Sequence, residues 1–107
     1  MTSLSSARSA LDAGSWQLAR TAFQVVAEET ADPLAYEGVA QAAWWLDEGE
    51  TCVGARETAY QRHRELGDSL GAARAATDLA WDSLLFGHGE SVALSWWRRA
   101  ESLLGAC

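Results

Sequence analysis

An internal repeat constrains the fold more than any other feature of the chain. Ala19, Phe23 and Val26 align with Cys52, Arg56 and Ala59 at an offset of 33, and with Ala93, Trp97 and Ala100 after a further 41. The small first residue of each trio lets its helix lie close to a neighbour, and the large residue four positions on fills the adjoining space. Arg56 departs from this pattern and weakens the middle unit. The repeat predicts a stack of similar units.

Turn-forming residues divide the chain into six segments of helical length. Gly14 before Ser15 indicates a helix end and a new N-cap, and Asp32 before Pro33 indicates an N-cap with proline in the first helical position. Further breaks are expected at Gly49, at Gly67-Asp68 and at Gly87 to Gly89. The predicted helices span about 3–13, 16–30, 33–47, 51–66, 69–86 and 91–104.

The spacing of apolar residues is helical throughout. The last segment carries Ala93, Trp96, Trp97, Ala100, Leu103 and Leu104, and the second carries Trp16, Ala19, Phe23 and Val26. Strict two-residue alternation is not sustained anywhere, so no sheet is expected. The eight extra residues of the second offset lie around Gln61 to Ala72, which predicts longer helices on both sides of Gly67-Asp68.

Length and charge limit the classes of function. A chain of 107 residues fits one domain. Its net charge is -7, it has no Lys and it shows no basic stripe, so direct nucleic-acid binding is not expected and basic partners are favoured. Apolar runs such as Ala42 to Leu46 are too short to cross a membrane, and we expect a cytoplasmic protein. Cys52 and Cys107 are expected to be reduced thiols.

The chain resembles tetratricopeptide repeats over about residues 4 to 104. The resemblance rests on the 33-residue offset and on fragments such as Ala13-Gly14-Ser15-Trp16 through Ala19 to Phe23, although Trp81 stands where a small residue is usual. It implies an all-α fold, a right-handed stack of about three helix-turn-helix hairpins with six helices. Residues 1–107 would form one domain with repeat units at about 3–30, 33–66 and 69–104.

A narrower resemblance is to the helical repeat region of bacterial LuxR-type transcriptional regulators. It rests on Glu37-Gly38-Val39-Ala40 to Trp44-Trp45-Leu46, on Ala55-Arg56-Glu57 to Ala59-Tyr60, and on Leu79-Ala80-Trp81-Asp82. In that family such repeats accompany a C-terminal DNA-reading helix-turn-helix, for which no residues follow the third hairpin here. The resemblance therefore implies a regulatory or adaptor segment, either excised or stand-alone, without DNA binding.

No pattern of reactive residues points to chemistry. The candidate metal ligands are Cys52, His63, His88 and Cys107. They show neither CxxC nor HxxxH spacing, and no nucleophile elbow is present, so we expect no metal, no cofactor and no enzymatic activity. Cys52 is expected in the core, His63 on a solvated Arg-rich helix and His88 in a glycine turn.

The tryptophans are more informative. Trp44-Trp45 and Trp96-Trp97 are adjacent pairs, and adjacent helical residues point about 100° apart, so both members cannot be equally deep in one seam. One member of each pair could face a groove. Alternatively, both are packed, because a hairpin stack has two buried faces.

Tetratricopeptide stacks bind peptides along a concave surface formed mainly by the first helix of each hairpin. In this chain the groove would be lined by Arg8, Leu11, Glu37, Gln41, Trp44, Trp45, Asp78, Asp82, Leu85 and Phe86. With Arg8 as its one basic member it would be acidic with an apolar floor, and an acidic C-terminal tail would be a poor ligand. We expect it to bind a basic or amphipathic segment, with partner charges meeting Glu37, Asp78 and Asp82.

Two further hypotheses concern other partners. The stripe of Trp96, Ala100, Leu103 and Leu104 would leave an open apolar end that a second copy could cover, giving a homodimer. A different class of function is a small-molecule sensor, in which the Trp pairs and Tyr36 enclose an apolar ligand. An enclosed pocket would favour the sensor, and an open groove would favour a non-catalytic protein-interaction module.

Overall fold

The protein is all-α, as predicted. The structure, a computed structural model, describes residues 2–105 and contains no strand within that range. Its helices are α1 (Leu4–Asp12), α2 (Trp16–Thr30), α3 (Pro33–Trp45), α4 (Gly49–Glu65), α5 (Ser69–Leu85) and α6 (Glu90–Gly105). Every predicted helix is present, and the ends agree to within two residues.

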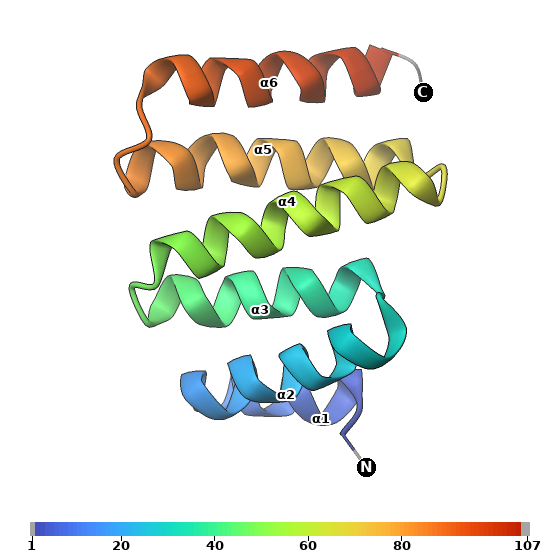
Figure 1. Cartoon of the computed structure of the whole chain (residues 1–107), viewed down its shortest axis with the longest axis vertical. Coiled ribbons are helices and arrows are strands. Elements are labelled where there is room, and N and C mark those ends of the chain that lie inside the picture. The colour runs from blue at the N-terminus through green and yellow to red at the C-terminus, as the bar shows by residue number, and fades with distance from the viewer. Residues whose placement is uncertain (1, 106–107) are drawn as a thin grey trace.

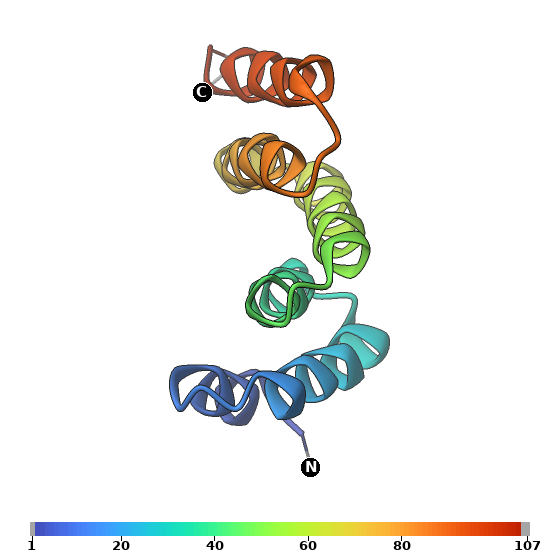
Figure 2. The ribbon, with the colours of Figure 1, turned by 90° about the vertical axis from the view of Figure 1, so that its left-hand side faces the viewer.

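Consecutive helices run antiparallel and form a stack of three hairpins along the longest axis of the molecule (Figure 1). The stack measures 39 × 30 × 19 Å. Figure 2 shows α1, α3 and α5 as one layer on the concave side, with α2 and α4 behind them. None of the helices in the described part of the chain is long and apolar enough to cross a membrane.

Local capping explains where the helices begin. The Asp32 carboxylate accepts a hydrogen bond from the Leu34 N–H at 2.9 Å, and Pro33 occupies the first turn of α3 as predicted. Asp68 caps α5 in the same way through the Gly71 N–H, also at 2.9 Å. The turns before these helices therefore fix the hairpin geometry through backbone groups that would otherwise lack partners.

The turn between α3 and α4 lies before Gly49 rather than at it. Asp47 adopts the left-handed conformation with φ of 58°, and Gly49 is already the first residue of α4. Gly49 matters for packing instead, because a Cβ atom there would lie 2.7 Å from Cδ1 of Phe86. The missing side chain lets the Phe86 ring cover the start of α4.

The repeat register coincides with the pattern of burial. The small residues Ala19, Cys52 and Ala93 have no exposed surface, and Val26, Ala59 and Ala100 are buried two turns further along. Between them lie Phe23, Arg56 and Trp97, of which the first two are buried and the third is partly buried. Helices α4 and α5, which flank Gly67-Asp68, have 17 residues each, which confirms the expected lengthening.

The last helix contradicts the placement of the predicted self-association residues. Trp96 and Ala100 are buried against the core and Leu103 packs on it, so the stripe faces inward rather than outward. Leu104 alone among the four is half exposed. Most of the exposed positions of α6 are polar, namely Glu90, Ser91, Arg98, Arg99, Glu101 and Ser102. The exposed apolar residues are Val92, Leu94 and Leu104. The exposed surface of α6 is therefore mixed, and the predicted stripe, which is mostly buried, gives no reason to expect a homodimer.

Close helix approach also depends on Gly38 in α3. A Cβ atom at this position would overlap the ring of Phe23, which is almost completely buried in α2. Helices α2 and α3 can therefore pack with the aromatic ring directly against the α3 backbone.

This contact predicts opposite effects for two identical substitutions. Gly38→Ala should lower the free energy of unfolding by about 1–3 kcal/mol, because the new methyl group displaces the Phe23 ring. Gly54→Ala, in the interior of α4 with open space around it, should raise it by roughly 0.5–1 kcal/mol. Urea unfolding of both variants measures the difference, and a stabilised Gly38→Ala protein would contradict this account.

Candidate functional site

The structure places the predicted groove residues on α1, α3 and α5, apart from Phe86, which caps the C-terminus of α5. These helices form the concave layer (Figure 2). The residues differ in what they contact, so the groove has a polar row across its middle, an aromatic hollow at one side and an apolar ridge on α5.

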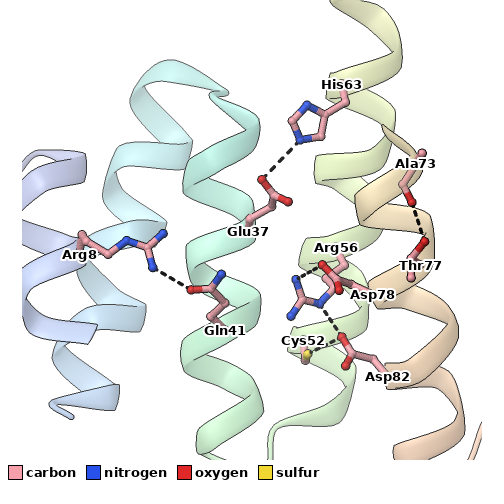
Figure 3. A network of polar contacts seen from close by, with 10 residues as sticks. All are labelled: Arg8, Glu37, Gln41, Cys52, Arg56, His63, Ala73, Thr77, Asp78 and Asp82. Carbon is pink, nitrogen blue, oxygen red and sulfur yellow. Dashed lines mark hydrogen bonds and ion pairs between the residues drawn. The ribbon is translucent and has the colours of Figure 1, made fainter. Parts of the chain in front are cut away.

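The polar row begins between α1 and α3. Arg8 Nη1 donates to Gln41 Oε1 at 2.9 Å, and the Arg8 guanidinium carbon lies 5.7 Å from the centre of the Phe23 ring. Figure 3 shows Arg8, Gln41 and Arg56 following one another across the helices. The row therefore connects the first and second hairpins through an uncharged amide.

The row continues with an ion pair that the sequence analysis did not predict. Arg56, from α4, donates through Nε to Asp82 Oδ2 at 2.5 Å and through Nη1 to Asp78 Oδ2 at 3.3 Å (Figure 3). The Asp82 side chain is 8% exposed and that of Asp78 is 47% exposed. The expectation that Asp82 lies free in the groove is therefore wrong, because its carboxylate is buried against Arg56.

Burial and charge change the ionisation of this cluster in defined directions. Burial by itself lowers the pKa of Arg56, but the charges of Asp82 and Asp78 outweigh it and raise the pKa, so the guanidinium stays charged. Burial raises the pKa of Asp78, and Arg56 opposes that change only in part. The cluster holds a permanent cation between two carboxylates of unequal exposure.

Cys52 lies beside the same ion pair. Its Sγ donates to Asp82 Oδ2 at 3.4 Å, and the side chain is completely buried, as expected for a core residue. Burial, and then the negative charge of Asp82, raise the pKa of the thiol to about 12. The thiol is therefore protonated and unreactive at neutral pH. Cys107 lies outside the described residues.

Glu37 is paired with a buried histidine. Its Oε2 lies 3.4 Å from His63 Nε2, and Asp68 Oδ2 lies 3.3 Å from the other ring nitrogen without the alignment of a hydrogen bond. The expectation of a solvated His63 is wrong, because its ring is buried against Glu37 of α3 and the start of α5, where Gly71 leaves room for it. Glu37 is thus less accessible to a partner than its position suggested.

The aromatic residues of the groove remain exposed. Trp44 is 39% exposed and Trp45 is 57% exposed, and Trp45 stacks on Trp16 with ring centres 4.9 Å apart. Beside them is a hollow of about 200 Å³ that opens to solvent. It is lined by Leu11, Gln41, Trp44, Trp45 and Arg56. The other tryptophan pair behaves differently, since Trp96 is buried and Trp97 partly so.

Helix α5 adds an apolar ridge. Leu85 is exposed as predicted, whereas Phe86 is partly buried against the core and Gly49. The sequence analysis did not place Trp81 in the groove, yet it is 61% exposed and contacts Trp97 edge to face at 5.3 Å. A second open hollow, of about 300 Å³, is lined by Leu70, Ala73, Arg74, Thr77, Asp78 and Leu104.

A larger hollow lies on the other layer of the stack. It has a volume of about 490 Å³, lies between α2 and α4, and is bordered by Glu28 and Glu50. Its one aromatic residue, Tyr36, is partly buried. We place the candidate site on the concave face instead, because exposed tryptophans are the side chains that most often anchor protein contacts. Within residues 2–105 no three His, Cys, Asp or Glu side chains are grouped so as to hold a metal ion.

These features define the class as an all-α helical-hairpin stack with an aromatic and polar concave face. Comparison with protein-family models, with curated proteins and with solved structures gives no significant match. The resemblances to tetratricopeptide repeats and to LuxR-type regulators therefore stay predictions from the sequence.

The ion pair predicts unequal effects for two neighbouring aspartates. Asp82→Ala should lower the free energy of unfolding by about 3–5 kcal/mol, because it removes the closer partner of a buried guanidinium. Asp78→Ala, the matched change at the exposed partner, should cost less than about 1 kcal/mol. Equal losses in urea unfolding would show that Arg56 does not depend on Asp82.

The raised thiol pKa predicts that Cys52 is masked in the folded protein. In a Cys107→Ser variant, which leaves Cys52 as the one thiol, an aromatic disulfide reagent should react at the rate of global unfolding. The same variant in concentrated urea supplies the rate of the exposed thiol. Rapid reaction under native conditions would mean that the Cys52 pocket opens locally.

Proposed function

We propose that this chain is a non-catalytic protein-interaction module that binds a polypeptide segment along its concave face. The observation that carries the proposal is the exposure of Trp44 and Trp45 on α3 beside an open hollow, with Trp81 also exposed on α5. Covering a large exposed apolar side chain with a partner lowers the free energy of the complex, because apolar surface is removed from water. Tryptophan is also enriched among the residues that dominate binding energy.

The shape of the hollows favours a peptide over a small ligand. The hollow beside Trp44, of about 200 Å³, and the one between α5 and α6, of about 300 Å³, are both open to solvent rather than enclosed. A small-molecule site usually encloses most of its ligand in some 300–1,000 Å³. An extended or helical segment needs only side-chain-sized depressions along an open surface, which is the geometry present here.

The partner's character follows from the charges that stay accessible. Of the three acids expected to meet a basic segment, Asp82 and Glu37 are paired internally and Asp78 remains half exposed. We therefore propose an amphipathic partner whose apolar side meets the tryptophans, with any basic residue over α5. A regulatory role related to transcription regulators is a narrower proposal, and it rests on the sequence resemblance alone.

Trp45 provides the direct test of this proposal. Peptides would be selected on the immobilised protein from a random dodecapeptide phage library, and the affinity of the best of them measured by fluorescence anisotropy. Trp45→Ala should weaken binding by about 30-fold, corresponding to roughly 2 kcal/mol for a central aromatic anchor.

Leu18→Ala is the matched control, because Leu18 is 65% exposed but lies on α2, behind the concave layer. It should leave the affinity unchanged. Equal binding by the wild type and both variants would show that the selected peptides use another surface, and a library that yields no binders would overturn the proposed function itself.

A further inference from the structure

The polar side chains that line the hollow beside Trp44 and Trp45 keep hydrogen-bond donors for a ligand. Gln41 is the first of them. Its Oε1 accepts from Arg8 Nη1, and this fixes the amide orientation because a guanidinium has no acceptor atom. The Gln41 Nε2 group makes no hydrogen bond within residues 2–105, so both of its N–H groups can donate to a ligand, whereas Oε1 is already engaged by Arg8.

Arg56 is the second polar residue of the hollow. Its Nε and Nη1 are used by Asp82 and Asp78, whereas Nη2 makes no hydrogen bond to any described residue. Both carboxylates belong to α5, on the side of Arg56 away from Gln41 (Figure 3). The acids therefore hold the guanidinium in place without lining the hollow themselves.

The remaining walls are apolar. They are the side chains of Leu11, Trp44 and Trp45, and Arg8 adds a second positive charge next to Gln41. A site with apolar walls and donor groups is complementary to an acceptor carried on an apolar group. A carboxylate satisfies it best, because hydrogen bonds from a guanidinium to a charged acceptor are about twice as strong as those between neutral groups.

We propose that this hollow binds an Asp or Glu side chain of the partner segment together with an adjacent aliphatic or aromatic side chain. The carboxylate accepts from Arg56 Nη2 and Gln41 Nε2, and the apolar neighbour lies against Trp44 and Trp45. This inference rests on the proposed function and reverses the basic preference expected at this point of the groove. A Lys or Arg side chain carries no acceptor for the N–H groups of Arg56 and Gln41, and it would bring a third positive charge next to Arg56 and Arg8.

The overall charge of -7 does not remove this preference. Charges farther away than about 8 Å are largely screened at physiological ionic strength, whereas the donors of the hollow act at contact distance. The two nearer acids, Asp78 and Asp82, are paired with Arg56 and do not line the hollow. The net charge should slow association of an acidic segment, and the local donors should determine which residue is held once contact is made.

The experiment is the same library selection, and the result measured is the amino-acid sequence of each selected peptide. Peptides selected on the wild type should carry Asp or Glu next to a Leu, Phe or Trp residue. Gln41→Glu keeps the oxygen that accepts from Arg8 but replaces the N–H donor with a second carboxylate oxygen. This variant should bind the selected acidic peptides at least about tenfold more weakly, the loss expected for a charge-assisted hydrogen bond replaced by repulsion.

Gln61→Glu is the control, since it makes the same change of residue and charge at an exposed position of α4. Its affinity should match the wild type, and replacing the Glu of the peptide by Gln should weaken wild-type binding but not binding to Gln41→Glu. Selected peptides without an enriched acid, or with Lys or Arg in its place, would overturn this inference while the proposed function stands. A selection without binders would overturn both.

Discussion

The stack depends on how it accommodates one buried cation. Arg56 occupies the position that Phe23 fills in the first hairpin and Trp97 in the last. An unpaired charge at such a depth would cost several kcal/mol, so α5 must present carboxylates to it. Asp78 and Asp82 do so from successive turns of one helix face, since they are four residues apart. The pairing therefore fixes the axial position of α5 against α4, and hence of the third hairpin against the second.

The parts of the fold that follow from local chemistry could be predicted from the sequence. Asp32 and Pro33 begin a helix wherever they lie in the molecule, because their effects act on the next turn of backbone. The small residues Ala19, Cys52 and Ala93 could be recognised as buried because they occupy equivalent positions in three repeat units, which pack in the same way. The repeat could not predict how the packing differs from one unit to the next.

The errors arise where one helix determines the environment of another. Asp82 was expected to meet a partner's charges because the repeat register places it in the groove, but its environment is set by Arg56 from a different helix. The same holds for His63, whose neighbours Glu37 and Asp68 come from α3 and from the turn before α5. A signal existed in the sequence for Asp82: Arg56 is a charged residue at a register position that Phe23 and Trp97 fill in the other units, and such a residue requires a buried counter-charge nearby.

Binding chemistry follows from this same pairing. The count of charged residues predicted an acidic groove. The Asp82 carboxylate is paired with Arg56, however, and is not available to attract a partner. Within the described residues the Arg56 guanidinium still has a free N–H group that can donate to a ligand in the hollow. The polarity of a surface is set by which atoms remain unpaired rather than by which residues are present. In this stack the interaction that aligns the second and third hairpins also positions Arg56 at the floor of the hollow, so the stability of the fold and the chemistry of its concave face are linked through one side chain.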